Sequence, residues 1–172
     1  QVEEILAAAQ PPRWDNLVMP LEAMEHRLAR AWAPVGHLNA VHNTAALREA
    51  YNACLPLLSD FGSELGQHEG LFRAYERVLA EQGAELAPGQ RKILEDALRD
   101  FRLAGVALPP EERARFRAIM QELSMLGARF EEHLLDATQA WRLEVRDPAR
   151  LEGLPEDART RAREAAQSRG LD

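Results

Sequence analysis

Residues 110–141, PEERARFRAIMQELSMLGARFEEHLLDATQAW, carry a long and regular helical pattern. The apolar side chains recur in steps of three and four residues, which is the repeat of one face of an α-helix. They are Phe116, Ile119, Leu123, Leu126, Phe130, Leu134, Ala137 and Trp141. Pro110 suits a first helical turn, and Glu111 and Glu112 place negative charge at the positive end of the helix dipole. The pattern predicts an amphipathic helix with a solvated face opposite a buried one.

A second helical stripe precedes this segment. Its members are Leu47, Tyr51, Cys54, Leu58, Phe61, Leu65, His68, Phe72, Tyr75 and Leu79. Asn43 or Thr44 is expected to cap its start, and Gly83 to end it in the left-handed conformation. Three glycines, Gly62, Gly66 and Gly70, interrupt the stripe and are expected to let another helix approach closely. The spacing allows either one kinked helix or two helices with a break between residues 66 and 70.

Shorter helical patterns fill most of the remaining chain. One runs from a cap at Asp15 to Leu38, one from Pro88 to Gly105, and a short one occupies residues 2–9. Residues 155–170 predict a last helix with little to bury, at the edge of the fold. Residues 141–146 alternate apolar and charged side chains, which allows one short strand whose partner lies outside the chain. The prediction is an all-α array of antiparallel helical hairpins in a single domain, 1–172, with at most one short strand near 142–146.

Composition limits the possible partners. The 172 residues include 21 Lys and Arg against 28 Asp and Glu, a net charge of −7, so binding to nucleic acid is not expected. No apolar run approaches the roughly 18 residues of a membrane span. Cys54 is the only cysteine, which excludes an internal disulfide and suits a reducing compartment. The chain starts at Gln1 and stops without a clear terminating pattern, so we expect a piece of a longer cytoplasmic polypeptide.

Side chains for metal binding or catalysis are widely spaced. The five histidines are His26, His37, His42, His68 and His133. A helical zinc site needs two histidines three or four residues apart, and none of these pairs has that spacing. His68-Glu69 begins like the HExxH zinc motif, but no second histidine follows. His68 is therefore expected to be a hydrogen-bonded histidine at a helix interface, and Cys54 a small buried apolar side chain. The residues predict no catalytic group and no metal ligand in this chain.

A set of short motifs in a fixed order resembles a known family. They are WDNL (14–17), PVGHLN (34–39), LREAY (47–51), LPLLS (55–59), GQHEGL (66–71), ALRDF (97–101), GVALP (105–109) and LDAT (135–138). In this order they resemble the N-terminal region of bacterial members of the thimet-oligopeptidase family of zinc metallopeptidases. The resemblance extends from about Arg13 to Leu154.

The resemblance implies a mostly helical peptidase whose two lobes flank a deep channel that admits short peptides. In this family one zinc ion is bound by the two histidines of HExxH and a downstream glutamate, and the motif's own glutamate activates water. These residues lie C-terminal to the matching region, so no catalytic or metal-binding role transfers to this chain. The chain would form part of the channel wall and pack against the missing C-terminal catalytic region.

Two expectations accompany this interpretation. A lobe without its partner should expose apolar surface, and Trp141 with the Leu143/Val145 segment is the expected place. The alternative function, which composition and periodicity alone support, is a stand-alone helical module for protein interactions without enzymatic activity.

Overall fold

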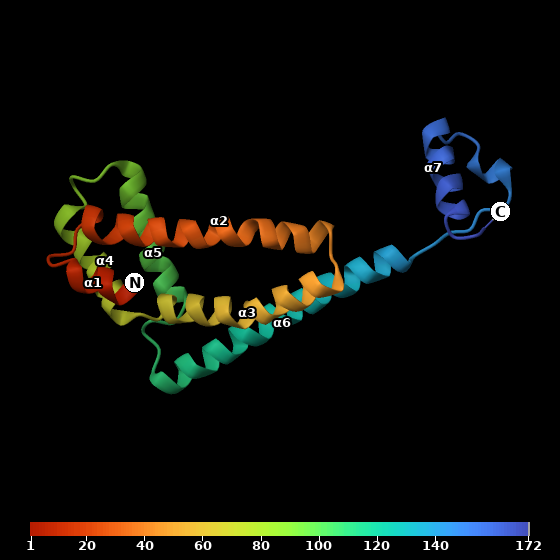
Figure 1. Cartoon of the computed structure of the whole chain (residues 1–172). Coiled ribbons are helices and arrows are strands. Elements are labelled where there is room, and N and C mark those ends of the chain that lie inside the picture. Colours follow the sequence, from red (N-terminus) through yellow and green to blue (C-terminus); the bar gives the residue numbers. More distant parts are fainter. Residues whose placement is uncertain (172) are drawn as a thin grey trace. The chain divides into compact units, whose positions relative to one another are not determined.

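The computed structural model describes residues 1–171, in which helices are joined by short connections (Figure 1). In chain order the helices are α1 (Val2–Ala8), η1 (Trp14–Val18), α2 (Met19–Val41), α3 (Ala45–Gly66), α4 (Glu69–Gln82), α5 (Pro88–Leu103), α6 (Pro110–Ala140), η2 (Pro148–Leu151) and α7 (Glu156–Gln167). No strand occurs within the described residues, and 142–146 belong to no regular element. The predicted all-α fold is confirmed.

The chain forms two compact units. The first is Gln1–Glu131, and the second begins at Glu132. The second unit contains the end of α6, the 3-10 turn η2 and α7, and none of residues 132–171 is buried. Helix α7 lies within the range predicted for the last helix. Trp141 and Leu143 are 72% and 62% exposed, as expected, whereas Val145 is partly buried.

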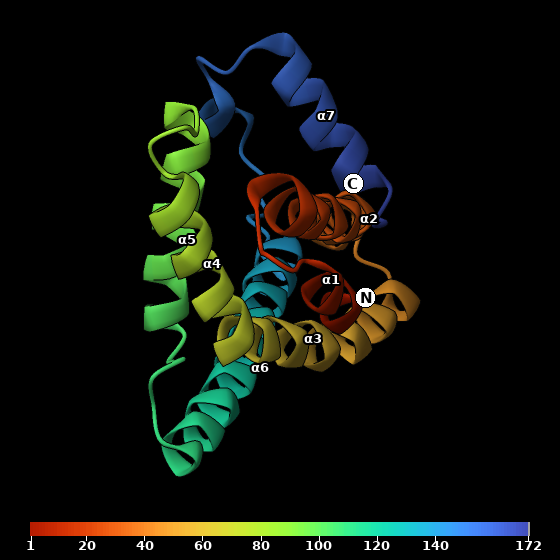
Figure 2. The same cartoon turned by 90° about the vertical axis from the view of Figure 1, so that its left-hand side faces the viewer.

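The core of the first unit lies where α1, η1 and the start of α2 pack against α4 and α5. Figure 2 shows α4 and α5 side by side. The buried apolar residues are Ala9, Leu17, Val18, Leu21, Leu71, Ala74, Tyr75, Val78, Leu94, Leu98, Phe101 and Val106. The Phe101 ring meets the edges of Phe72 and Tyr75 at centroid distances of 6.0 and 5.6 Å. Such edge-to-face pairs are favoured by the ring quadrupoles, so they help to orient α5 on α4.

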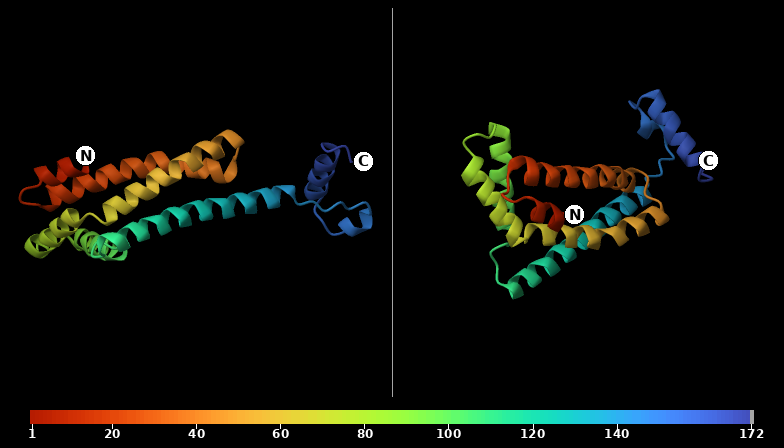
Figure 3. Two further views of the ribbon diagram at one scale, coloured as in Figure 1. Left: turned by 90° about the horizontal axis from the view of Figure 1, so that it is seen from below. Right: turned by 60° about the vertical axis from the view of Figure 1, so that its left-hand side comes forward.

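Helices α2 and α3 form an antiparallel hairpin (Figures 1 and 3). The Trp32 ring stacks on Tyr51, with centroids 5.0 Å apart, and so joins the two helices away from the main core. Pro34 and Pro56 lie inside these helices, and each helix continues past its proline. Thr44 caps α3, because its hydroxyl oxygen accepts a hydrogen bond from the Leu47 N–H at 3.2 Å.

The second stripe forms two helices rather than one kinked helix. Helix α3 ends at Gly66, and α4 begins at Glu69 after two intervening residues. A Cβ atom on Gly66 would lie 2.7 Å from the Ala104 Cβ, and one on Gly70 would lie 3.1 Å from the Leu6 side chain. These two glycines therefore permit the close approach that the sequence predicts, whereas the space beside Gly62 is open.

Two local predictions were wrong. Asp15 does not cap α2; it lies inside the π-helical turn η1, which starts where the Arg13 N–H donates to Asn16 Oδ1 at 2.8 Å. Gly83 does end α4, but with a right-handed φ of −56°. The left-handed glycine of the first unit is Gly105, with φ +85°, directly after α5. An ordinary C-terminal turn suffices at Gly83, because its N–H continues the helical pattern by bonding to the Leu79 carbonyl.

Candidate functional site

The histidines are dispersed over the structure. Four of them are exposed: His26 and His37 lie on α2, His42 directly follows α2, and His133 lies on α6. His68 is half-buried between α3 and α4. Within residues 1–171, no group of three or more His, Cys, Asp and Glu side chains could hold a metal ion. Cys54, expected to be buried, is only partly buried on α3. The side chains with specific partners are instead the polar groups that join the helices.

His68 caps α4 and links it to α1. Its Nδ1 atom accepts a hydrogen bond from the Leu71 N–H at 3.1 Å, so Nδ1 carries no hydrogen. The hydrogen must then be on Nε2, which lies 2.9 Å from a carboxylate oxygen of Glu3 and donates to it. One neutral tautomer satisfies both contacts. His68 is thus the hydrogen-bonded interface histidine that the sequence predicts, and its ring is committed to structure.

Replacing His68 with alanine should destabilise the first unit by about 1 kcal/mol, because the cap of α4 is lost. The matched variant His68→Asn keeps a side-chain acceptor suited to an N-cap but is too short to reach Glu3. Urea unfolding followed by circular dichroism should place His68→Asn close to the wild-type protein. Equal losses in both variants would show that the contact with Glu3, rather than the cap, stabilises this junction.

Gln67 lies between α3 and α4, directly after the end of α3, and its side chain connects this point to α5 and α6. Its side chain is 3% exposed, and its Nε2 atom donates to the Ala104 carbonyl at the end of α5 at 3.1 Å. Its Oε1 atom accepts from the Arg117 guanidinium on α6 at 3.0 Å. Both ends of the amide are satisfied, so burial of this polar group carries little penalty. Sequence reasoning missed Gln67, because a glutamine between two predicted helices carries no local signal of which distant groups its amide contacts.

Helix α6 runs antiparallel to α3 and is held to it and to α4 by a line of polar contacts. Arg113 lies 3.0 Å from a Glu69 carboxylate oxygen, Arg117 binds Gln67, and Gln121 donates to the Asp60 carboxylate at 2.7 Å. The three α6 residues are four positions apart, so they follow one side of the helix. The sequence predicted that this polar side of α6 would face solvent. That prediction was wrong, because the polar side contacts α3 and α4.

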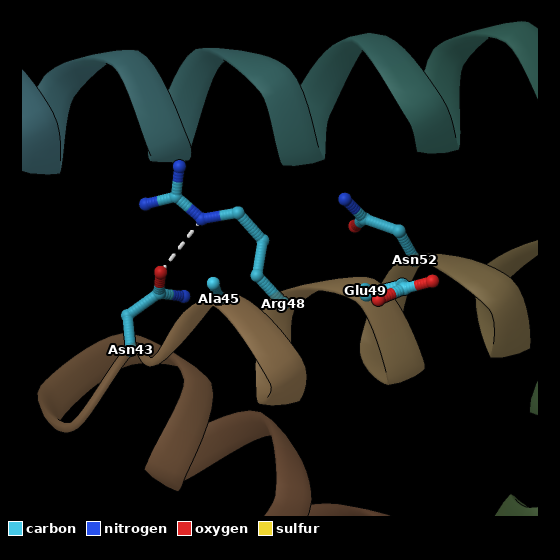
Figure 4. Close-up of a pocket in the computed structure, with 5 residues that line it drawn as sticks. All are labelled: Asn43, Ala45, Arg48, Glu49 and Asn52. Atoms are coloured by element: carbon cyan, nitrogen blue, oxygen red, sulfur yellow. Dashed lines mark hydrogen bonds between the residues drawn. The ribbon is translucent and has the colours of Figure 1, made fainter.

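A pocket lies beside the turn between α2 and α3 (Figure 4). Its lining residues are Asn43, Ala45, Arg48, Glu49 and Asn52. Arg48 Nε donates to Asn43 Oδ1 at 2.7 Å, and Asn43 in turn donates to the Asn39 side chain at 2.7 Å. These bonds fix the α2–α3 turn. The pocket offers a carboxylate, Glu49, next to a guanidinium group, Arg48, and the Arg48 side chain is engaged by Asn43 at the turn.

Two exposed acidic side chains of α2, Glu22 and Glu25, lie close enough to the buried Tyr75 to act on its hydroxyl group. Desolvation raises the pKa of the Glu25 carboxyl group, and the nearby Glu22 carboxylate adds to the rise. Burial, with smaller contributions from Glu22 and Glu25, also raises the pKa of the Tyr75 hydroxyl. The Tyr75 hydroxyl therefore stays protonated at neutral pH. The region concentrates negative charge beside an apolar core, which costs stability.

Replacing Glu25 with glutamine should slightly increase stability at pH 7. A folded-state pKa above the unfolded value means that the native state binds a proton more readily, so stability falls as pH rises from 4.5 through the raised folded pKa. The neutral amide removes this loss. The urea midpoints of the wild type and of Glu25→Gln, measured from pH 3.5 to 8, should therefore agree at acidic pH. As pH rises, the midpoint of the variant should become the higher of the two. A constant difference at all pH values would contradict this origin.

The described part of the chain consists of helices joined by polar contacts, and it contains no group of three or more His, Cys, Asp and Glu side chains that could hold a metal ion. Residues 1–113 match the family model for the N-terminal domain of neurolysin and thimet oligopeptidase. Oligopeptidase A of Haemophilus influenzae is 44% identical over 92% of the chain, and Oligopeptidase A of Escherichia coli is 42% identical over 99%. A protein named probable cytosolic oligopeptidase A of Arabidopsis thaliana is 33% identical over 97%. The chain belongs to the neurolysin/thimet oligopeptidase family, which confirms the resemblance of the motifs.

The chain spans about a quarter of the length of these relatives, 23% of the first, 25% of the second and 24% of the third. The matched family model describes an N-terminal domain, so most of each relative has no counterpart here. No helix in residues 1–171 has the length and apolar character needed to span a membrane.

Proposed function

We propose that this chain is the non-catalytic N-terminal helical domain of a cytoplasmic zinc oligopeptidase. The observation that carries the proposal is the match of residues 1–113 to the N-terminal domain of the family, together with more than 40% identity to two proteins named Oligopeptidase A. The name of the plant relative, which includes the word cytosolic, and the single unpaired cysteine support the compartment.

Zinc would be bound outside this chain. The family binds zinc with histidine and glutamate side chains, and the described residues offer no group of three such side chains. His68, which starts an HExxH-like sequence, uses both ring nitrogens in hydrogen bonds to Leu71 and Glu3. The residues present do not fit the metal, so this domain contributes no step of the hydrolysis.

The domain's contribution is to form part of the wall of a channel that admits short peptides. A wall has to keep its shape, and the polar line on α6, the Gln67 junction and the stacked pair Trp32–Tyr51 all restrict movement between helices. A rigid narrow entrance excludes folded proteins by size and admits flexible peptides.

The isolated 172-residue chain, purified with added zinc and assayed with a short quenched fluorescent peptide, should show no turnover. The natural full-length polypeptide assayed in parallel should cleave the peptide and lose activity with a chelator. Turnover by the isolated chain that survives repurification would overturn the assignment of a non-catalytic role.

The second candidate is a stand-alone helical module that binds another protein. The exposed apolar side chains of α6 favour it, because such surfaces mark interaction sites. The full reading frame separates the two: an HExxH segment several hundred residues downstream supports the peptidase, whereas a stop codon shortly after residue 172 supports the module.

A further inference from the structure

Helix α6 has its polar face turned toward its own domain and its apolar face turned away. Arg113, Arg117 and Gln121 lie on the side that contacts α3 and α4. At 3.6 residues per turn, the apolar positions fall on the opposite side of the helix. These residues, here called the α6 stripe, are Ile119, Leu123, Leu126 and Phe130, with exposed fractions of 45%, 56%, 49% and 69%.

This orientation is the reverse of the usual one. A surface helix normally buries its apolar side against the core and leaves its charged side in water. Here the charged side is occupied by specific partners, including the buried Gln67, so the helix cannot rotate without leaving that amide unpaired. The orientation is thus determined by hydrogen bonds. The α6 stripe is left as a continuous apolar surface that no other helix of the first unit covers.

The size of the stripe indicates what covers it. Four side chains that are about half exposed offer on the order of 400 Å², half of the roughly 800 Å² per partner that stable complexes between separate proteins bury. Interfaces between domains of one chain bury about 600–1,500 Å² in total over both sides, which the stripe and an equal opposing area would supply. A second copy of this chain is therefore a poorer fit than a domain of the same polypeptide.

We propose that the α6 stripe is the surface on which the polypeptide that follows the N-terminal domain packs. The proposal rests on the proposed function, in which about three quarters of the protein lies beyond this chain, as in the relatives. The opposing surface is apolar, and within one polypeptide the high effective concentration of the two domains compensates for the small area. The stripe then holds the channel wall against the catalytic region.

The test compares the same variants in the natural full-length protein and in the isolated chain. The stripe variant is Leu123→Ala with Phe130→Ala. The matched control is Leu57→Ala with Leu103→Ala, because these leucines are 69% and 70% exposed on α3 and α5. In the isolated chain neither pair should move the urea midpoint. In the full-length protein the stripe pair alone should increase the rate of proteolytic separation of the two domains by roughly a hundredfold, at about tenfold for each truncated side chain.

Hydrogen exchange provides a second measurement. The amides of α6 around Leu123 should exchange at least tenfold more slowly in the full-length protein than in the isolated chain. Equal exchange rates, or equal effects of both variant pairs, would overturn the proposal. So would a dimer of the isolated chain that the stripe variant dissociates, because the partner would then be a second copy. Peptidase activity of the full-length wild type is measured separately, so its absence would refute the proposed function and not the packing of α6.

Discussion

Leu71→Ala is expected to lower the free energy of unfolding by about 2–5 kcal/mol. Leu71 is 1% exposed in the first turns of α4, within the cluster where this helix meets α1 and α5. Truncation removes the apolar contacts and leaves a cavity that helices bridged by hydrogen bonds on several sides can close only in part. Because natural domains are stable by only about 5–15 kcal/mol, the loss is large. Urea unfolding followed by circular dichroism at 222 nm measures it.

The control is Leu103→Ala, at the last residue of α5. This leucine is 70% exposed, so its truncation removes little buried area and is expected to change stability by less than about 0.5 kcal/mol. The pair changes the same atoms in two environments on neighbouring helices. Comparable losses for the two variants would mean that the core is not where the structure places it.

Gly66→Ala is expected to destabilise the chain by about 1–3 kcal/mol, although alanine normally favours helices. An added Cβ would lie 2.7 Å from the Ala104 Cβ, and a Cβ atom cannot rotate away. The ends of α3 and α5 would have to separate. That movement would also lengthen the hydrogen bond from Gln67 to the Ala104 carbonyl, so the loss should include the Gln67 junction.

Gly62→Ala, one turn earlier in α3, is expected to stabilise the chain, the opposite of the effect of Gly66→Ala. No atom beyond its own helix backbone lies within 4 Å of the added Cβ, so the substitution should gain about 0.5–1 kcal/mol from helix propensity. Both variants are measured by thermal and urea unfolding. If both substitutions stabilised the chain, the close contact between α3 and α5 would be refuted.

The helices themselves could be predicted from the sequence. The stripe from Leu47 to Leu79 shows one face of a helix, and Thr44 offers a short side-chain oxygen at its start; both are local signals that hold whatever surrounds them. The break between α3 and α4 was one of the two alternatives that Gly66 and Gly70 allowed, and the sequence did not decide between them. Asp15 shows the limit of this reasoning. A good capping residue does not cap when neighbouring hydrogen bonds, here from Arg13 to Asn16, start a different turn.

The role of the glycines was foreseeable only as a group. All three have the same spacing, yet only Gly66 and Gly70 have a neighbour close enough to exclude a side chain. Which glycine matters depends on where α1 and α5 cross, and that is a property of tertiary packing. Gln67 is similar, since nothing in its local sequence shows that its amide lies between the Ala104 carbonyl and Arg117.

The amino-acid sequence by itself determined the helical class, most helix ends and, through the order of its motifs, the family, because periodicity, capping and motif order are local properties. Only the tertiary structure decided which side of α6 faces inward. On the polar side of that helix, Arg113 contacts Glu69 and Arg117 contacts Gln67 within the first unit. On its apolar side, the α6 stripe packs against no other helix of that unit and stays exposed. A periodic pattern specifies that two faces differ, and the choice between them depends on which neighbours are present.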